Sequence, residues 1–123
     1  MQPGINAYAS AARTAKTAIP PRELEAELLM KAATHLQSVA DHWESRAGEL
    51  DAALDFNRKL WTLLASALAR PDHPLPARDR QNLLNLANFI LAESFRISAT
   101  ASREALPSLI DINRNIAAGL RGR

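Results

Sequence analysis

The side chains that most often carry out chemistry are scattered along this chain. None of the three histidines, His35, His42 and His73, is followed or preceded by carboxylates at the spacing of a metal-binding motif. No Ser nucleophile lies in a recognisable turn, Cys is missing, and the four glycines form no phosphate-binding loop. The sequence therefore predicts a protein that is not an enzyme and that has no metal ion or other cofactor.

Two asparagines offer the clearest polar chemistry, because each falls in the middle of an apolar helical face. Asn57 lies among leucines and Trp61 at helical spacing, and Asn113 takes the same place in a second segment. Residues 54–58 and 110–114 share the pattern apolar, Asp, apolar, Asn, Arg. An inward amide can fix the register of a helix by bonding inside the core. Alternatively, Asn57 beside Trp61 can offer its donor and acceptor to the backbone of a bound peptide.

Further side chains are candidates for contact with a partner protein. Phe89 and Met30 are large apolar residues that helical periodicity places away from the core, and such residues would form a docking patch if adjacent. Arg22 and Glu25 fall in a first helical turn, where they either contact a partner or pair to seal the end of the helix. The candidate partner-binding residues are Asn57, Trp61, Phe89, Met30, Arg22 and Glu25.

These residues sit on amphipathic helices that prolines and glycines separate. Ala and Leu dominate the chain, and β-branched residues never alternate as they do in strands. The segment 77–98 is expected to place Phe95 in the core, whereas the segment 6–18 has only a thin apolar stripe. Residues 1–20 are therefore expected to form a loosely packed arm. The pattern predicts an all-α, compact bundle of about five helices, at residues 6–18, 21–46, 49–69, 77–98 and 106–121.

Composition and charge narrow the class of protein. A length of 123 residues with 47% hydrophobic residues predicts one domain, residues 1–123. The net charge is only +2, and the basic residues form no cluster beyond the C-terminal Arg114, Arg121 and Arg123, so nucleic-acid binding is not favoured. No apolar run approaches the roughly 18 to 20 residues that cross a bilayer, and the first residues lack the features of a signal peptide. We expect a cytoplasmic protein without membrane contact.

Five short motifs follow one another along nearly the whole chain. They are Ala7-Tyr8-Ala9, Pro21-Arg22-Glu23-Leu24-Glu25, Asn57-Arg58-Lys59-Leu60-Trp61, Leu75-Pro76 with Arg80, and residues 109–114 with Gly119-Leu120. In this order they resemble the motifs of the FlaF family, small flagellar biosynthesis proteins of alphaproteobacteria. The chain departs from the family pattern at two positions. His73 stands where the family usually has Asn, and Asp79 replaces an apolar residue.

The resemblance implies a cytoplasmic factor that binds flagellin and supports its synthesis and export, as a chaperone or regulator that acts with FlbT. Flagellin and FlbT are thus the implied partners. A second hypothesis is an RNA-binding post-transcriptional regulator, which the sequence pI of about 9.5 and the family's link to translation control suggest. A third is a structural subunit of a helical complex with FlbT. The absence of interleaved aromatic and basic residues favours the first hypothesis.

Overall fold

The computed structural model describes residues 21–122, and every regular element in that range is a helix. The all-α class that the sequence predicted is therefore confirmed, with four long helices. The predicted helix at residues 6–18 and the predicted N-terminal arm lie outside the described residues. The elements are α2 (Pro21–Asp41), α3 (Trp43–Arg46), η2 (Ala47–Glu49), α4 (Leu50–Leu68), α5 (Ala77–Thr100), η3 (Arg103–Ala105) and α6 (Leu106–Leu120).

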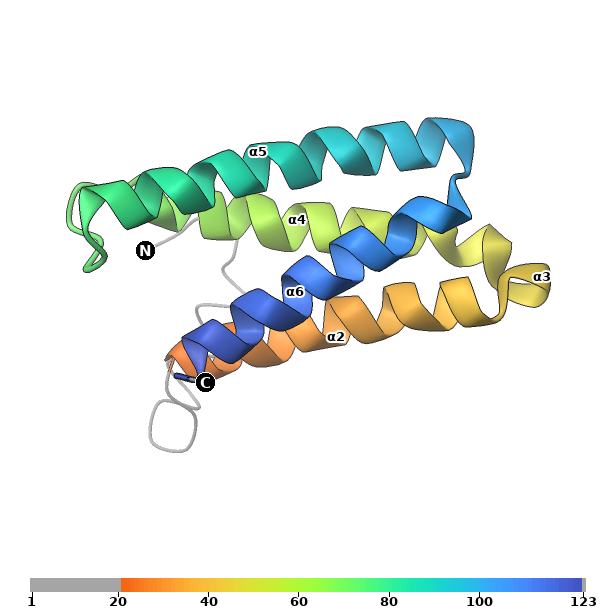
Figure 1. Ribbon diagram of the computed structural model, residues 1–123, viewed down its shortest axis with the longest axis horizontal. Helices are drawn as coiled ribbons and strands as arrows, with labels where there is room; N and C mark the ends of the chain where they lie inside the picture. The colour runs from red at the N-terminus through yellow and green to blue at the C-terminus, as the bar shows by residue number, and fades with distance from the viewer. Residues whose placement is uncertain (1–20, 123) are drawn as a thin grey trace.

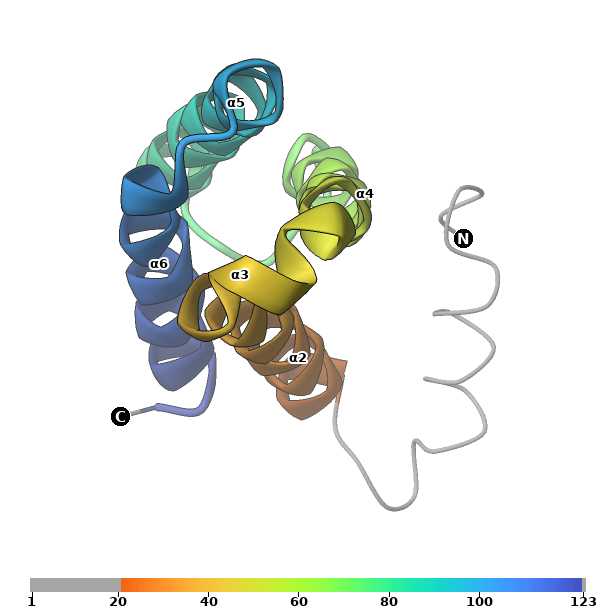
Figure 2. The ribbon, with the colours of Figure 1, turned by 90° about the vertical axis from the view of Figure 1, so that its right-hand side faces the viewer.

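The four long helices alternate in direction around a shared core. Figure 1 shows α2 and α5 running from left to right and α4 and α6 running back from right to left, and Figure 2 shows the four helices arranged around a common centre when viewed from one end. The closest packing joins α2 to α6, α4 to α5, and α2 to α4. The last helix, α6, runs obliquely from beside the end of α5 to beside the start of α2 (Figure 1). As a result, α5 and α6 diverge towards the end of the bundle where α5 begins.

Small side chains allow the close approach of α2 and α6. Ala26 and Ala33 on α2 and Ala117 on α6 are completely buried. Because alanine lets two helix backbones come near each other, a polar side chain of one helix can reach the backbone of the other. The larger buried core residues are Leu29, Leu36, Val39, Leu50, Leu54, Leu60, Trp61, Leu68, Ile90, Ile97, Leu106, Leu109 and Ile110.

The helix predicted for residues 21–46 is interrupted at one residue. His42 leaves the helical conformation, with φ −120° and ψ 41°, so that α2 ends at Asp41 and α3 begins at Trp43. Ser38 holds this break, because Arg46 Nη1 donates to its Oγ at 2.6 Å and His42 Nδ1 lies 3.1 Å from its carbonyl oxygen. The break turns the chain towards α4 without a proline or glycine at its centre.

The prediction that Phe95 belongs to the core is wrong, since the side chain is 63% exposed. The buried residues of α5 form a narrow arc, in which Ser94 takes an inward position and donates its hydroxyl to the Ile90 carbonyl at 2.7 Å. Phe95 lies one residue, or about 100°, beyond that arc. Its ring is instead covered by the Arg58 guanidinium, 4.9 Å from the ring centroid.

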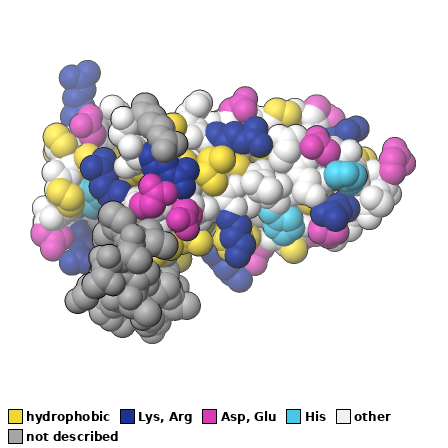
Figure 3. Space-filling model, turned by 90° about the horizontal axis from the view of Figure 1, so that it is seen from below, with side chains coloured by type: hydrophobic (Ala, Val, Ile, Leu, Met, Phe, Trp, Pro, Cys, Tyr) yellow, Lys and Arg dark blue, Asp and Glu magenta, His cyan; other side chains and the backbone are white. Residues whose placement is uncertain are grey.

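Charges of both signs are mixed on the face of the bundle that is seen from below. Figure 3 shows acidic and basic side chains interspersed on the part of the lower face that described residues form. Between residues 21 and 122, no helix has the length and apolar character needed to span a bilayer.

Candidate functional site

A chain of buried hydrogen bonds joins three helices. The Trp61 indole Nε1 donates to Asn113 Oδ1 at 2.9 Å, and Asn113 Nδ2 donates to Asn57 Oδ1 at 2.7 Å and to the Leu29 carbonyl at 3.3 Å. The direction of this chain is fixed, because an indole nitrogen can only donate. The two asparagines that the sequence singled out therefore bond to each other, and they link α4 to α6 and α6 to α2. We call these residues, Asn57, Trp61 and Asn113, the amide–indole chain.

The amide–indole chain ends on a donor without a partner. Asn57 is fully buried, and its Nδ2 has no hydrogen-bond partner among the described residues. The fixed direction explains this, because Asn57 must present its oxygen to Asn113 and so turns its nitrogen away. A buried unpaired amide costs on the order of 1–3 kcal/mol of stability. The core thus keeps a polar group at some energetic cost.

A pocket of about 470 Å³ opens where α5 and α6 diverge. The start of α2, the end of α4, the turn before α5 and the end of α6 all contribute to it. Most of its lining is aliphatic, and the ionisable side chains are few. We call this the end pocket; its lining residues are Arg22, Glu25, Leu64, Ala67, Leu68, His73, Pro74, Leu75, Leu83, Ile116 and Leu120.

Arg80 holds the turn that forms one wall of the end pocket. Its Nε donates to the Leu75 carbonyl at 3.2 Å, and its Nη1 donates to the carbonyls of Leu68 and Arg70 at 3.4 and 3.3 Å. The guanidinium therefore satisfies carbonyls at the end of α4 that the helix itself leaves free. Leu75 also donates its backbone N–H to His73 Nδ1 at 3.2 Å. Burial, followed by the nearby Arg80 cation, lowers the pKa of His73 below its usual value, which favours this neutral acceptor.

An ion pair between α2 and the end of α6 stabilises the opposite wall of the end pocket. Arg121, just after α6, donates from Nε to Glu23 Oε2 at 2.7 Å, and this partly buried contact holds the end of α6 against the start of α2. Hydrogen bonding to Glu23 raises the pKa of Arg121 above its usual value. The last turn of α6, with Leu120, is therefore held beside the first turns of α2.

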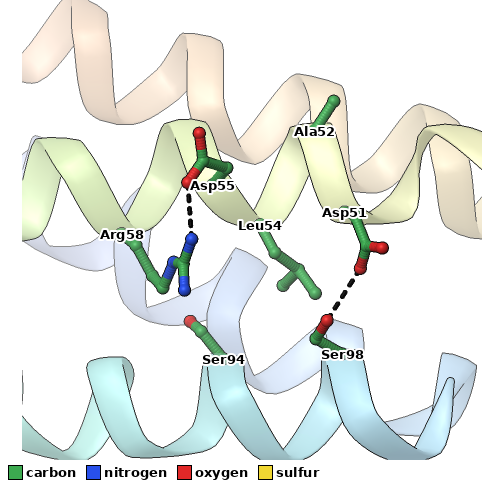
Figure 4. Close-up of a pocket in the computed structure, with 7 residues that line it drawn as sticks. All are labelled: Asp51, Ala52, Leu54, Asp55, Arg58, Ser94 and Ser98. Carbon is green, nitrogen blue, oxygen red and sulfur yellow. Dashed lines mark hydrogen bonds and ion pairs between the residues drawn. The ribbon is translucent and has the colours of Figure 1, made fainter.

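A second hollow, between α4 and α5, is more polar. Figure 4 shows Ser98 bonded to Asp51, at 2.7 Å, and Arg58 bonded to Asp55 on its rim. The hydrogen bond from Lys59, and then that from Arg58, lowers the pKa of Asp55. These groups already bond within the protein, so the hollow suits an apolar partner less well than the end pocket. Its volume is about 350 Å³, and it is lined by Asp51, Ala52, Leu54, Asp55, Arg58, Ser94 and Ser98.

The structure separates the six predicted partner-binding residues into three groups. Arg22 and Glu25 both line the end pocket, and Phe89 is 47% exposed on α5, as predicted. Met30, on α2, is partly buried against the core, and α2 and α5 lie on opposite sides of the bundle (Figure 2), so these two residues form no common patch.

Asn57 and Trp61 form the third group, inside the core. There they reach a partner only if the helices move apart.

Sequence reasoning placed the aliphatic lining of the end pocket in the core or in a turn. Leu83, Ile116 and Leu120 carry the periodicity of core residues, and they line a pocket only because the helix ends diverge. Leu75 did carry a signal, since an apolar residue between Pro74 and Pro76 cannot belong to a helical core face.

Residues 22–122 bring no three His, Asp, Glu or Cys side chains together in a group that could hold a metal ion. The end pocket itself offers apolar burial, with hydrogen-bonding and ionisable side chains among its lining.

Comparison with known proteins places the chain in a family. A family model described as flagellar protein FlaF matches residues 5–120, a range that includes the amide–indole chain and the whole end pocket. No curated protein and no solved structure matches the chain. Because the family match covers nearly the full length, the chain belongs to the FlaF family of flagellar proteins.

Proposed function

We propose that this protein binds flagellin through the end pocket and thereby supports flagellin synthesis and export. It would do so in the cytoplasm, without catalysing a reaction, and with FlbT as a further partner. The observation that supports this proposal is an apolar pocket at the open end of the bundle, in a chain of the FlaF family. Membership of the family links the protein to the flagellum, and the pocket supplies an apolar surface to which a flagellar protein can bind.

The chemistry of the end pocket suits an amphipathic helix. Its volume of about 470 Å³ lies in the range of roughly 300–1,000 Å³ that is typical of pockets that bury a ligand. Leu75, Leu83 and Leu120 offer partly exposed aliphatic surface, so a helix with large apolar side chains one turn apart can bury them there. Arg22 is exposed at the rim, where it can pair with an acidic residue beside that apolar face.

The terminal segments of flagellin are amphipathic and stay unassembled until export. A protein that covers their apolar stripe prevents that stripe from associating with other chains. Coupled folding of such a segment costs several kcal/mol of ordering, which burial of apolar area must exceed. Affinity is therefore expected to depend strongly on the aliphatic lining.

The test is calorimetric titration of the full chain with peptides from the two ends of flagellin. The variants Leu75→Ser and Leu120→Ser each remove apolar lining at a partly exposed position, so the fold should persist, as circular dichroism would verify. We expect each to weaken binding at least tenfold, which corresponds to about 1.4 kcal/mol. Phe89→Ser is the matched control, because it removes an exposed apolar side chain outside the pocket.

Different outcomes separate the alternatives. Unchanged affinity in both pocket variants would refute the end pocket as the binding site, and a loss in Phe89→Ser alone would move the site to α5. Binding to RNA, the alternative function, depends on phosphate contacts and weakens steeply with salt, whereas burial in an apolar pocket hardly responds to salt. The mixed surface charge supports the protein client.

A further inference from the structure

Arg22 and Glu25 are the two side chains of the end pocket that are charged at neutral pH, and they differ in their partners. Glu25 already takes part in an interaction. Arg22 is exposed in the first turn of α2, and its side chain forms no hydrogen bond or ion pair with another residue in the range 21–122. A guanidinium that is free beside an apolar surface can bind a carboxylate through charge-assisted hydrogen bonds.

Two carboxylates next to lining residues already bond to other arginines. Glu23, which follows Arg22 in the chain, accepts from Arg121 Nε at 2.7 Å. Asp72, in the turn before α5, accepts from Arg70 Nε at 3.2 Å and from Arg70 Nη2 at 3.1 Å. Neither carboxylate pairs with Arg22, whose guanidinium therefore remains available to a carboxylate of a bound molecule.

The position of Arg22 does not favour the helix on which it lies. The N-terminus of a helix carries a partial positive charge, so an acidic side chain in the first turn stabilises the helix and a basic one does not. Glu23 follows this preference, whereas Arg22 in the same turn opposes it. The presence of Arg22 at the rim of an apolar pocket is therefore better explained by a bound anion than by the stability of α2.

The charges that act on the turn side of the end pocket are also mainly positive. Burial is the main cause of the lowered pKa of His73. Among the charged groups around this ring, Arg80 and Arg70 lower the pKa further, and Asp72 raises it. The neutral ring itself adds no charge to the pocket. The electrostatic potential on this side therefore favours an anionic ligand over a cationic one.

From these observations, we infer that the end pocket selects amphipathic segments that carry a carboxylate beside their apolar face, and that Arg22 determines this selectivity. The inference rests on the proposed function and names the chemistry of the segment that binds. An Asp or Glu three or four positions from the buried apolar residues lies on the same side of a bound helix, so it can reach the rim. A Lys or Arg at that position disfavours binding, because it brings two cations together.

Calorimetric titration of the full chain with flagellin peptides tests the inference. In the peptide that binds, each Asp or Glu is changed singly to Asn or Gln. One of these changes should weaken binding to the parent protein about fivefold. Arg22→Glu should weaken binding of the unchanged peptide about tenfold, because repulsion replaces attraction. Arg22→Glu should then bind the neutralised peptide more tightly than the unchanged one, which is the reverse of the order in the parent protein.

Arg78→Glu is the matched control. Arg78 is exposed in the first turn of α5 and does not line the end pocket. It lies at the same end of the bundle as Arg22, since α2 and α5 both begin there (Figure 1). The two substitutions change the net charge equally, so Arg78→Glu should bind every peptide as the parent protein does.

A pair of small amphiphiles makes the selectivity measurable without flagellin. Decanoate and decylammonium have similar apolar tails and opposite charges. In NMR titrations below the micelle concentration, decanoate should shift the signals of Leu75 and Leu120 at lower concentrations than decylammonium does. Arg22→Glu should reverse this order, and Arg78→Glu should keep it.

Three results would overturn the inference: equal affinity of Arg22→Glu and the parent protein for the unchanged peptide, an equal loss in Arg78→Glu, or the same order of the two amphiphiles in Arg22→Glu and the parent. If Leu75→Ser and Leu120→Ser still weaken peptide binding, the proposed function stands without the inference. If no flagellin peptide binds, the proposed function fails, and the order of the amphiphiles decides the inference.

Discussion

The amide–indole chain predicts that two similar substitutions, Asn57→Leu and Asn113→Leu, have unequal effects on stability. Both residues are completely buried asparagines within the same apolar pattern. They differ in their hydrogen bonds, because Asn113 is the middle of the chain and Asn57 is its end. The pattern alone cannot separate them, so the difference tests the geometry itself.

Asn57→Leu removes one hydrogen bond and one unpaired group. The lost bond, to Asn113 Nδ2, is worth about 1 kcal/mol net, and Asn113 Nδ2 retains the Leu29 carbonyl. Removing the unpaired Asn57 Nδ2 relieves a cost on the order of 1–3 kcal/mol. The free energy of unfolding should therefore stay within about 1 kcal/mol of the parent or rise.

Asn113→Leu breaks the chain in its middle. It leaves the Trp61 indole N–H and Asn57 Oδ1 buried without partners, in addition to the Asn57 nitrogen that already has none. Each new unpaired group costs on the order of 1–3 kcal/mol, and burial of the leucine side chain offsets part of the sum. We expect a net loss of about 2–4 kcal/mol, which is a large share of the stability of a domain of this size.

Urea unfolding followed by circular dichroism measures both changes. Asn115→Leu, at an exposed position on α6, is the control and should stay within about 0.5 kcal/mol of the parent. In the double variant Asn57→Leu with Asn113→Leu, the cost should be less than the sum, because the Asn57 oxygen is no longer left unpaired. The reasoning fails if Asn57→Leu costs more than about 2 kcal/mol, or if it costs as much as Asn113→Leu.

Three further predictions concern single positions. Ala101 ends α5 with φ 51°, a left-handed conformation that favours glycine. Ala101→Gly should therefore raise the free energy of unfolding by about 1 kcal/mol in the same urea assay. Ala99→Gly, inside the helix, should lower it by a similar amount. The pKa of His73 is lower in the folded protein, so the unfolded chain binds the proton first as the pH falls, and the free energy of unfolding should decrease below about pH 6.5. Urea unfolding at pH 7 and pH 5 should show a smaller decrease in His73→Gln than in the parent. Arg80→Lys keeps the charge but not the forked geometry that bonds Leu75, so hydrogen exchange in residues 69–76 should accelerate; unchanged exchange would contradict this role.

The helices and most of the core could be predicted from the sequence, because periodicity and proline position are local signals. The break at His42 could not, since the bonds that hold it involve Ser38 and Arg46 rather than a breaker residue. Helical periodicity predicts Phe95 within a wide core arc, whereas the narrow contact of α5 places Ser94 inside instead. Hydrophobicity identified a set of candidate core residues, and tertiary packing chose among them.

The candidate site was only partly predictable. Periodicity placed Asn57 and Asn113 inside, and the shared pattern suggested that they serve the same physical purpose. That they bond each other depends on the crossing of α4 and α6, which no local signal encodes. Arg22 and Glu25 were candidates because they lie at a helix start, but the end pocket beside them exists because α6 diverges from α5.

The positions of the amide–indole chain and the end pocket fit one mechanical arrangement. The polar bonds anchor α2, α4 and α6 at Leu29, Trp61 and Asn113. The pocket begins about one turn farther along, at Leu64 on α4 and Ile116 on α6. Leucines in place of the asparagines would let α6 slide against α4, whereas a directional chain of hydrogen bonds permits one register. The anchor therefore fixes the base of the pocket, and Arg80 and the Arg121–Glu23 ion pair hold its two walls.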